Sequence, residues 1–302
     1  MDSKWKQLQK ELKRRWPLYL LLLPALLYIL IFAYGPMYGV LIAFKDYKAS
    51  KGIMGSNWVG LKHFIRFLNY PDFMKMIRNT LGISVYSLAT FPIPVIIALL
   101  INELTGRFKK VVQMVTYAPY FLSTVVVCGM LVLLTGRDGP LGMLYGAITG
   151  TNQNLLLEAG LFRHIYVWSG VWQGIGWNAI IYLSALAGVD QEMHEAAIID
   201  GATKIQRMRY IDIPSIKGTI IMLLILRMGG IMNVGFEKVY LLQNDLNYNA
   251  SIIISTYVYE SGLLRGDYAF STAVGLFNNV INIILMVCAN TFSKKVLDDS
   301  LF

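Results

Sequence analysis

Charged and reactive side chains are scarce in this chain of 302 residues. Asp, Glu, Lys and Arg make up only 15% of it, where about a quarter is usual in soluble domains, and 56% of the residues are hydrophobic. This balance excludes an ordinary soluble domain and indicates a membrane protein. The two cysteines, Cys128 and Cys288, both lie in apolar stretches, so we expect neither a disulfide framework nor a cysteine metal site.

Signatures of catalysis are also missing. The three histidines, His63, His164 and His194, are scattered and lack the spacing of a metal site. The sequence contains no Gly-x4-Gly-Lys-Ser/Thr segment, so it has no P-loop of its own for ATP. It also shows no strand-turn nucleophile signature of the kind that accompanies a catalytic triad. We therefore expect no catalytic residue, no metal site and no cofactor in this chain.

The net charge of +9 could suggest a nucleic-acid partner. The basic residues, however, cluster in short loops beside hydrophobic stretches, as is typical of membrane proteins. No nucleic-acid-binding motif accompanies them. We therefore expect a membrane-embedded protein without a nucleic-acid partner.

Six apolar stretches are long enough to cross a hydrocarbon layer about 30 Å thick. They lie at about residues 17–44, 77–102, 111–135, 162–188, 215–236 and 270–293. The first is too long for the apolar region of a signal peptide and no small-residue cleavage site follows it, so we interpret it as a retained span. These stretches predict an all-α polytopic membrane protein. We divide it into a basic tail (1–16), a first span with an outer amphipathic segment (17–76) and a core of five spans (77–297).

The distribution of basic residues predicts the orientation. With the N-terminus inside, cytoplasmic segments hold fifteen of the twenty-seven Lys and Arg residues and outer segments hold eleven, seven of them between Lys45 and Arg78. This modest excess places both termini and residues 190–214 in the cytoplasm. In the outer loop, Leu61, Phe64, Ile65 and Leu68 recur at helical spacing. This pattern fits a helix that lies on the outer leaflet or, as we favour, packs on neighbouring spans.

The segment EAAIIDGATKIQRMRYIDIP, residues 195–214, carries the most specific pattern. Glu195, Ala196 and Ala197 are followed after three residues by Gly201, and after nine more by Ile211, one residue, Ile213 and Pro214. This spacing resembles the EAA signature of permease subunits of ATP-binding-cassette importers, with Ile213 in place of the usual Leu. In that family the loop docks onto a separate ATPase subunit, which gives ATPase-coupling roles to Glu195, Ala196, Ala197, Gly201, Ile211 and Pro214.

The resemblance extends over nearly the whole chain. Segments 35–47, 58–64, 79–85, 235–242 and 255–282, and the dipeptide Ala289–Asn290, look like the sugar-uptake branch of the family, in particular the LplB-type and alginate-importer permeases of oligosaccharides and polysaccharide fragments. The resemblance implies a type I (MetI-like) importer fold in a bacterial cell membrane. It also implies a second, usually non-identical permease subunit, two ATPase subunits that bind ATP and Mg²⁺, and an extracellular solute-binding protein that delivers the sugar.

Local chemistry in the same loop predicts a short helix. Asp190 is a suitable N-cap, and Gly201 a suitable left-handed terminator, for a helix of about ten residues. Glu195 could pair with a basic group of the ATPase or with Lys204 or Arg207 of its own loop. Pro214 suits the first turn of the next span because it lacks an N–H. An ordinary polar loop with a short helix is the alternative interpretation.

Arg227 is the most informative single residue for a substrate path. It lies about a dozen residues into the fifth predicted span, and no Asp or Glu lies inside any predicted span. A charge at that depth is costly and usually faces a water-filled cavity or a partner subunit. Arg227 could therefore line the path and bind sugar hydroxyls or a uronate carboxylate. The equal alternative is a structural arginine that bonds backbone carbonyls.

Sugar recognition combines aromatic faces with amide and charged groups. Several aromatic and amide residues of the last three spans could serve, although Trp residues also act as interface anchors and amides also bond helices to each other. The candidates are Trp172, Gln173, Trp177, Asn178, Asn233, Asn278 and Asn282.

Two other classes of protein compete with the importer permease. An ion-gradient-driven transporter or channel would be expected to carry carboxylates within its spans, and none are found. A membrane-embedded enzyme would need clustered acids, histidines or cysteines at membrane depth. The sequence predicts instead a non-catalytic permease that works by alternating access.

Overall fold

The computed structural model describes residues 2–297, and the side chains of residues 14–294. From the N-terminus the elements are α1 (Asp2–Ile29), η1 (Leu30–Tyr34), α2 (Gly35–Met37), η2 (Tyr38–Phe44), β1 (Lys45–Asp46), η3 (Ala49–Lys51), α3 (Gly52–Gly55), β2 (Asn57–Trp58), α4 (Lys62–Leu68), α5 (Phe73–Ala89), α6 (Pro92–Asn102), α7 (Gly106–Tyr117), η4 (Ala118–Phe121), α8 (Thr124–Thr135) and α9 (Pro140–Thr149). They continue with η5 (Leu155–Leu157), α10 (Ala159–Leu186), α11 (Gln191–Ile199), α12 (Lys204–Arg207), η6 (Met208–Asp212), α13 (Ile213–Ser215), α14 (Lys217–Gly229), α15 (Phe236–Leu242), α16 (Tyr248–Ser251), α17 (Ile254–Tyr259), η7 (Glu260–Leu264) and α18 (Tyr268–Leu297). The chain is mostly helical, as predicted.

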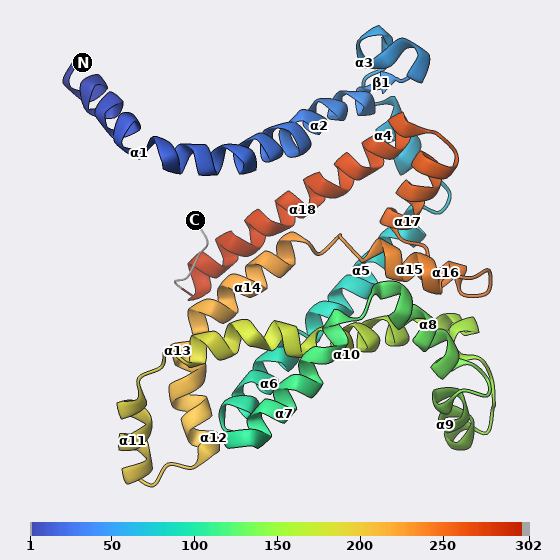
Figure 1. The fold of residues 1–302 in the computed structure, drawn as a ribbon. Helices are drawn as coiled ribbons and strands as arrows, with labels where there is room; N and C mark the ends of the chain where they lie inside the picture. Colours follow the sequence, from blue (N-terminus) through green and yellow to red (C-terminus); the bar gives the residue numbers. More distant parts are fainter. Residues whose placement is uncertain (1, 298–302) are drawn as a thin grey trace.

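Four apolar helical stretches of the described chain are long enough to cross a membrane: Arg14–Phe44, Phe73–Asn102, Thr124–Thr149 and Tyr268–Lys294. The first, second and fourth agree with the predicted spans 17–44, 77–102 and 270–293. The N-terminal stretch runs apart from the other helices and reaches them only at η2, beside α18 (Figure 1). None of its most apolar window is buried within the chain, so its surface is left for lipid or another subunit.

The third predicted span, 111–135, had the wrong bounds. Helix α7 ends at Tyr117, a 3₁₀ turn containing Pro119 follows, and α8 begins at Thr124. Ser123 caps α8 by accepting a hydrogen bond at Oγ from the N–H of Val126, at 3.3 Å. Proline followed by a serine cap is a stop-and-start signal within an otherwise apolar run. The apolar stretch therefore extends instead from Thr124 through α9.

The remaining two predicted spans differ in completeness. Helix α10 is 28 residues long, about 42 Å at 1.5 Å per residue, and covers most of 162–188. Helix α14 has only 13 residues, because the chain leaves the helix at Gly230 and resumes at α15. Irregular backbone at membrane depth is tolerated where it lines a cavity or is buried in protein. The count of six spans therefore remains a prediction.

Helix α10 is central to the packing of the core. It lies along α6, and its buried Ala179, Tyr182 and Leu186 join one cluster with Val95 and Ile216. A side chain at Gly176 would place a Cβ 2.2 Å from the carbonyl oxygen of Thr116, so α7 and α10 approach at backbone distance only because this residue is glycine. Figure 1 shows α10 crossing the bundle between α14 and α8, which lets it supply residues to both sides.

The outer segment packs on α18, as the favoured interpretation expected, but through a different face of its helix. In α4 the buried side chains are His63 and Phe67. Leu61, Ile65 and Leu68 of the expected apolar face are exposed. Next to α4, strands β1 and β2 form a short antiparallel pair in which Lys45 lies opposite Trp58. The predicted periodicity identified the helix but not which face is buried, since two turns offer too little pattern.

Candidate functional site

The segment 190–214 forms the capped helix that the sequence predicted. Asp190 Oδ1 accepts a hydrogen bond from the N–H of Glu192 at 2.9 Å, and α11 then runs to Ile199. Gly201 has φ +78°, and the N–H of Ala202 donates to the carbonyl of Ala197 at 2.8 Å. These bonds are the ordinary ends of a short helix. Figure 1 shows α11 and α12 projecting together beyond the rest of the bundle.

The second half of the segment returns the chain to the bundle. Thr203 and Gln206 form a capping box that starts α12, which continues through η6 into α13. Pro214 lies in the first turn of the short α13, just before the expected place, because α14 of the fifth predicted span begins only after Ile216. Ile211 is buried. The chain thus returns from α11 through α12, η6 and α13 to the start of α14.

The outer surface of this segment is apolar and unoccupied within the chain. Ile199 is 86% exposed and Ile205 is 76% exposed, and Met193, Ile198 and Tyr210 are exposed as well. Glu195 and Ala196 are also exposed, whereas Ala197 is half-buried. Apolar side chains gathered on a projecting loop are typical of a protein–protein contact surface.

The charges of the segment pair with each other and with the end of α6. Glu103, just after α6, has Oε2 3.4 Å from Nη2 of Arg207 and 3.6 Å from Nζ of Lys204. Of the two kinds of partner considered for Glu195, Lys204 and Arg207 of its own loop reach Glu103 instead, and a basic group of the ATPase stays a prediction. His194 Nε2 lies 3.1 Å from Oδ1 of Asp212. The contact of the enclosed Arg207 with Glu103 joins the segment to the end of α6, whereas the His194–Asp212 contact lies within the segment.

Asp212 is the most buried member of this charged group, with its side chain 1% exposed. Burial raises the pKa of the Asp212 carboxyl above its ordinary value, and the nearby Glu103 acts in the same direction. His194 and Arg207 oppose that shift. The carboxylate therefore depends on its histidine partner more than a solvent-exposed aspartate would.

Arg227, on α14, lies where three cavities meet. Their volumes are about 320, 240 and 150 Å³, and Arg227 is the one residue that lines all of them. Its Nη2 donates to the carbonyl of Ser87 at 3.3 Å. No carboxylate lines these three cavities in the described chain. The lining interpretation of Arg227 expected an arginine that faces such cavities, and the structural interpretation expected a bond to a backbone carbonyl such as that of Ser87.

Three other predicted residues share these cavities with Arg227. Asn233 lines the largest, and Gln173 and Asn178 line the second. The unwound residues 230–235 between α14 and α15 also form part of the wall of the largest cavity. This placement gives the break in the fifth span a structural purpose, because it opens backbone and small side chains to the cavity.

The remaining predicted residues lie elsewhere. Trp177 stacks on Tyr120 with ring centroids 4.4 Å apart. Asn278 and Asn282 each donate from Nδ2 to Oδ1 of Asn233, at 2.9 and 3.0 Å, and Asn282 Oδ1 accepts from the N–H of Met232 at 2.9 Å. These two amides fasten the unwound segment to α18, and neither lines the cavities around Arg227.

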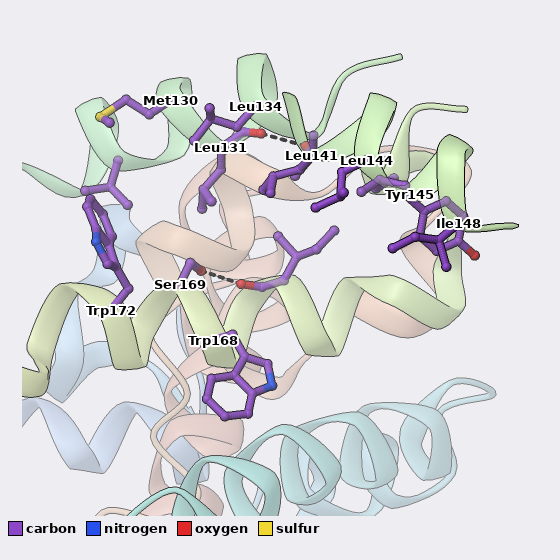
Figure 2. A pocket seen from close by; sticks show the side chains of 14 residues that line it. Met130, Leu131, Leu134, Leu141, Leu144, Tyr145, Ile148, Trp168, Ser169 and Trp172 are labelled. Atoms are coloured by element: carbon purple, nitrogen blue, oxygen red, sulfur yellow. Dashed lines mark hydrogen bonds between the residues drawn. The ribbon is translucent and has the colours of Figure 1, made fainter. Parts of the chain in front are cut away.

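Trp172 lines a separate cavity of about 500 Å³ between α8, α9 and α10. Figure 2 shows its wall, in which Leu131, Leu134, Leu141 and Leu144 face α10 and Ser169 supplies a rare polar group. Sugar recognition needs convergent polar groups, so this cavity suits hydrocarbon better than a sugar.

Sequence reasoning missed Lys238, Tyr166 and Ser87. Lys238, on α15, lines the second cavity with Arg227 although its residue surface is only 9% exposed. Its Nζ donates to the carbonyl of Tyr166 at 3.2 Å and lies 5.1 Å from the centre of that ring. Lys238 falls just after the predicted fifth span and was therefore assigned to an outer loop. The sequence pattern that could have identified it is its place beside Val239 and Leu242, which are apolar, lie one and four residues further on and are buried in the same helix.

Residues 79–298 match the family described as "Binding-protein-dependent transport system inner membrane component". The chain belongs to this family, and it is a multi-pass membrane protein with the fold that the sequence predicted.

Two relatives and one solved structure place it more narrowly. Protein LplB of Bacillus subtilis (strain 168) is 48% identical over 96% of this chain and 92% of its own length. The polygalacturonan/rhamnogalacturonan transport system permease protein YteP of the same organism is 43% identical over 99% of this chain and 94% of its own. A chain of the bacterial alginate ABC transporter, solved in complex with an alginate pentasaccharide-bound periplasmic protein, is 36% identical with a TM-score of 0.87, covering 98% of this chain and all of that one.

Proposed function

We propose that this chain is the transmembrane permease subunit of an ATP-driven, binding-protein-dependent importer of oligosaccharides or polysaccharide fragments. The observation that carries the proposal is the projecting, capped helix α11 with its exposed apolar side chains. It occurs in a chain whose α14 brings Arg227 to a set of connected polar cavities. The relatives named above are sugar or polysaccharide permeases where their names state a cargo. None of these observations favours the ion-gradient-driven alternative.

The first half of the mechanism is coupling. Helix α11 docks onto an ATPase subunit through the exposed Ala196, Met193 and Ile199, with Glu195 available to pair with a basic group of that subunit. Gly201 sets the direction of the return segment, and Ile211 and Pro214 anchor it at α13. Closure of the ATPase then moves α11 as a rigid body.

The second half of the mechanism is alternating access around Arg227. The polar cavities open to one side of the membrane at a time, and the sugar exchanges contacts with Arg227, Gln173, Asn178 and Asn233. This chain contributes only conformational change. ATP and Mg²⁺ are bound by the ATPase subunits, and the chain itself has no catalytic residue or cofactor.

The substrate path also indicates the charge of the cargo. Arg227 and Lys238 both line the second cavity, and no carboxylate accompanies them among the described lining residues. Both cations bond backbone carbonyls and have no carboxylate partner among these residues, whereas a uronate carboxylate would form charge-assisted hydrogen bonds with both groups. The relatives that transport alginate and polygalacturonan have such cargo. The proposed substrate is therefore an acidic oligosaccharide.

Three kinds of partner complete the importer. A second, non-identical permease subunit supplies the other half of the pathway. Two ATPase subunits bind the cytoplasmic side, one of them at α11 of this chain, and a solute-binding protein delivers the sugar at the outer end near β1 and β2. Membrane lipid or the second permease covers the exposed apolar surface of Arg14–Phe44.

A glycine pair provides the test. Gly201 has φ +78° with no heavy atom within 4 Å of a would-be Cβ, so backbone strain is the main effect of Gly201→Val, at a cost of about 1–2 kcal/mol or more. Gly218, on α14, is equally open but has ordinary helical backbone, so Gly218→Val is the matched control. The wild-type chain and the control should co-purify an ATPase and support uptake of labelled oligogalacturonate or oligoalginate.

Gly201→Val should lose both the ATPase and the uptake while the permease still inserts in the membrane. Normal ATPase recovery and uptake with Gly201→Val would contradict the coupling role of the segment. Uptake by the wild type of neutral oligosaccharides but of no acidic one would contradict the proposed charge of the cargo.

A further inference from the structure

Among the described contacts, the side chain of His194 connects helix α11 to a residue beyond its own ends, Asp212. Apart from His194 and Ala197, every side chain of α11 is exposed. His194 is 12% exposed and Asp212 is 1% exposed. A pair buried to this degree resists being pulled apart, because separation leaves an unpaired polar group out of water.

The position of Asp212 connects this tie to the substrate path. Asp212 is the last residue of η6 and directly precedes α13, which leads through Ile216 into α14. Ile216 is buried in the cluster shared by α6 and α10, so the foot of α14 is firmly packed. Arg227 lies ten residues along α14 from Lys217, about 15 Å at 1.5 Å per residue. A displacement applied at Asp212 therefore acts on the helix that carries Arg227.

The neighbouring charges make a second tie, to a different helix. Glu103, Arg207 and His194 are the charged or titratable groups that face Asp212, from the end of α6, from α12 and from α11. Arg207 is held to Glu103, so the return segment is fixed to the end of α6. In contrast, His194 contacts Asp212, the residue that directly precedes α13 and α14. The loop therefore has two side-chain contacts with different roles: Arg207 anchors it to Glu103, and His194 links α11 to Asp212.

We propose that the His194–Asp212 pair is the link through which movement of the coupling helix α11 reaches α14 and the cavities around Arg227. This inference rests on the proposed function, since it presupposes that an ATPase moves α11. His194 and Asp212 are positioning residues that touch neither ATP nor sugar. Without the pair, α11 still presents its apolar surface to the ATPase, but its displacement is no longer passed on to α14.

The test follows the substrate cavity rather than sugar uptake, so it needs no knowledge of the cargo. Ser87 lines two of the cavities around Arg227, and Ser87→Cys in a Cys288→Ser background provides a label site. The complex purified through this chain is treated with a water-soluble thiol reagent, with and without ATP and vanadate. Labelling of the thiol introduced at position 87 should change at least about fivefold between the two conditions when His194 and Asp212 are intact.

In the same background, His194→Ala should leave ATP hydrolysis within about twofold of the parent and reduce the labelling change to less than about 1.5-fold. His194→Gln, which keeps a hydrogen-bond donor near Asp212, should restore most of the change. Lys204→Gln is the control, because it removes a charge from an exposed pair on the same loop. It should label like the parent.

The pH profile gives a second readout. Protonation removes the charge of the Asp212 carboxylate, and burial raises the pKa of that group. The labelling change should therefore decline at a higher pH than an ordinary aspartate would cause, and Asp212→Asn should flatten this acid limb.

A parental labelling change in His194→Ala would overturn the link. So would a His194→Ala complex that loses hydrolysis and labelling together, because the pair would then serve assembly alone. If His194→Ala does not assemble, Asp212→Asn decides: normal hydrolysis with a reduced labelling change supports the link, and a parental labelling change overturns it. Failure of the proposed function looks different: the parent complex itself then recovers no ATPase, or its labelling ignores nucleotide.

Discussion

The coupling segment and the cavities around Arg227 are both polar regions of an apolar protein, but they treat charge differently. In the coupling segment the most enclosed polar side chains face one another: Arg207 pairs with Glu103, and His194 Nε2 lies 3.1 Å from Asp212 Oδ1. In the cavities, Arg227 and Lys238 bond only carbonyl groups among the contacts the structure describes. Balanced charges position the protein's own parts, whereas unbalanced cations in an accessible cavity are suited to an anionic ligand.

The largest expected effect comes from removing a cation of the cavities, which tests whether their unbalanced charge binds the cargo. Arg227→Ala removes the one side chain that lines all three cavities. Uptake of an acidic oligosaccharide by the reconstituted importer, and ATP hydrolysis stimulated by the loaded binding protein, should both fall about a hundredfold. That corresponds to about 2.7 kcal/mol, within the range for a lost charged hydrogen bond to a buried partner. Unchanged uptake and stimulated hydrolysis would remove Arg227 from the path.

A second change separates charge from volume. Lys238→Met keeps most of the side-chain length and removes the cation from the second cavity. Uptake of the acidic probe should fall about tenfold. Basal ATP hydrolysis should change little, since Lys238 is on α15 and is not part of the proposed ATPase contact at α11. The ratio of acidic to neutral probe taken up is the measurement. An unaltered ratio would show that Lys238 supports Tyr166 rather than the cargo.

The anchor in the coupling segment should respond differently. Glu103→Gln leaves the Arg207 side chain, which is 13% exposed, without a carboxylate, and removal of one member of a mostly buried pair costs about 3–5 kcal/mol at the upper limit. The expected result is a lower thermal midpoint of the detergent-solubilised permease, with a few-fold loss of uptake. The double variant with Arg207→Gln should recover part of that stability. If the single variant melts like the wild type, the Glu103–Arg207 pair does not hold the loop.

The same contrast explains what could be predicted from the sequence. The coupling helix is a local structure: Asp190, Gly201 and Pro214 each act within a few residues of themselves, so spacing was enough to locate it. The substrate path depends on residues brought together from α5, α10, α14 and α15, and only Arg227, Gln173, Asn178 and Asn233 of the predicted set meet there. Sequence cannot distinguish an amide that faces a cavity from one that fastens a helix break.

Lys238 and the third span show two further reasons why the sequence alone did not predict the structure correctly. The short α14 ends at a break whose position depends on tertiary support from Asn278 and Asn282, so the boundary drawn in the sequence assigned Lys238 to an outer loop. In the third span, the apolar content of 111–135 masked Pro119 and Ser123, which end one helix and cap the next. Hydropathy measures whether a segment can enter a membrane, and such breaks are decided by individual residues within it.

The smallest expected effect tests whether exposure, rather than the mere presence of an ion pair, separates the two kinds of tie in the coupling segment. Lys204 shares the carboxylate of Glu103 with Arg207, but its side chain is 68% exposed and the N–O distance is 3.6 Å. Exposed pairs contribute about 0.2–1 kcal/mol and are screened by salt. Lys204→Gln should therefore shift the thermal midpoint by about 1 °C or less and leave uptake within about twofold of the wild type, with the small difference vanishing in high salt. A loss comparable to that of Glu103→Gln would mean that Lys204, and not the enclosed Arg207, fixes the loop to α6.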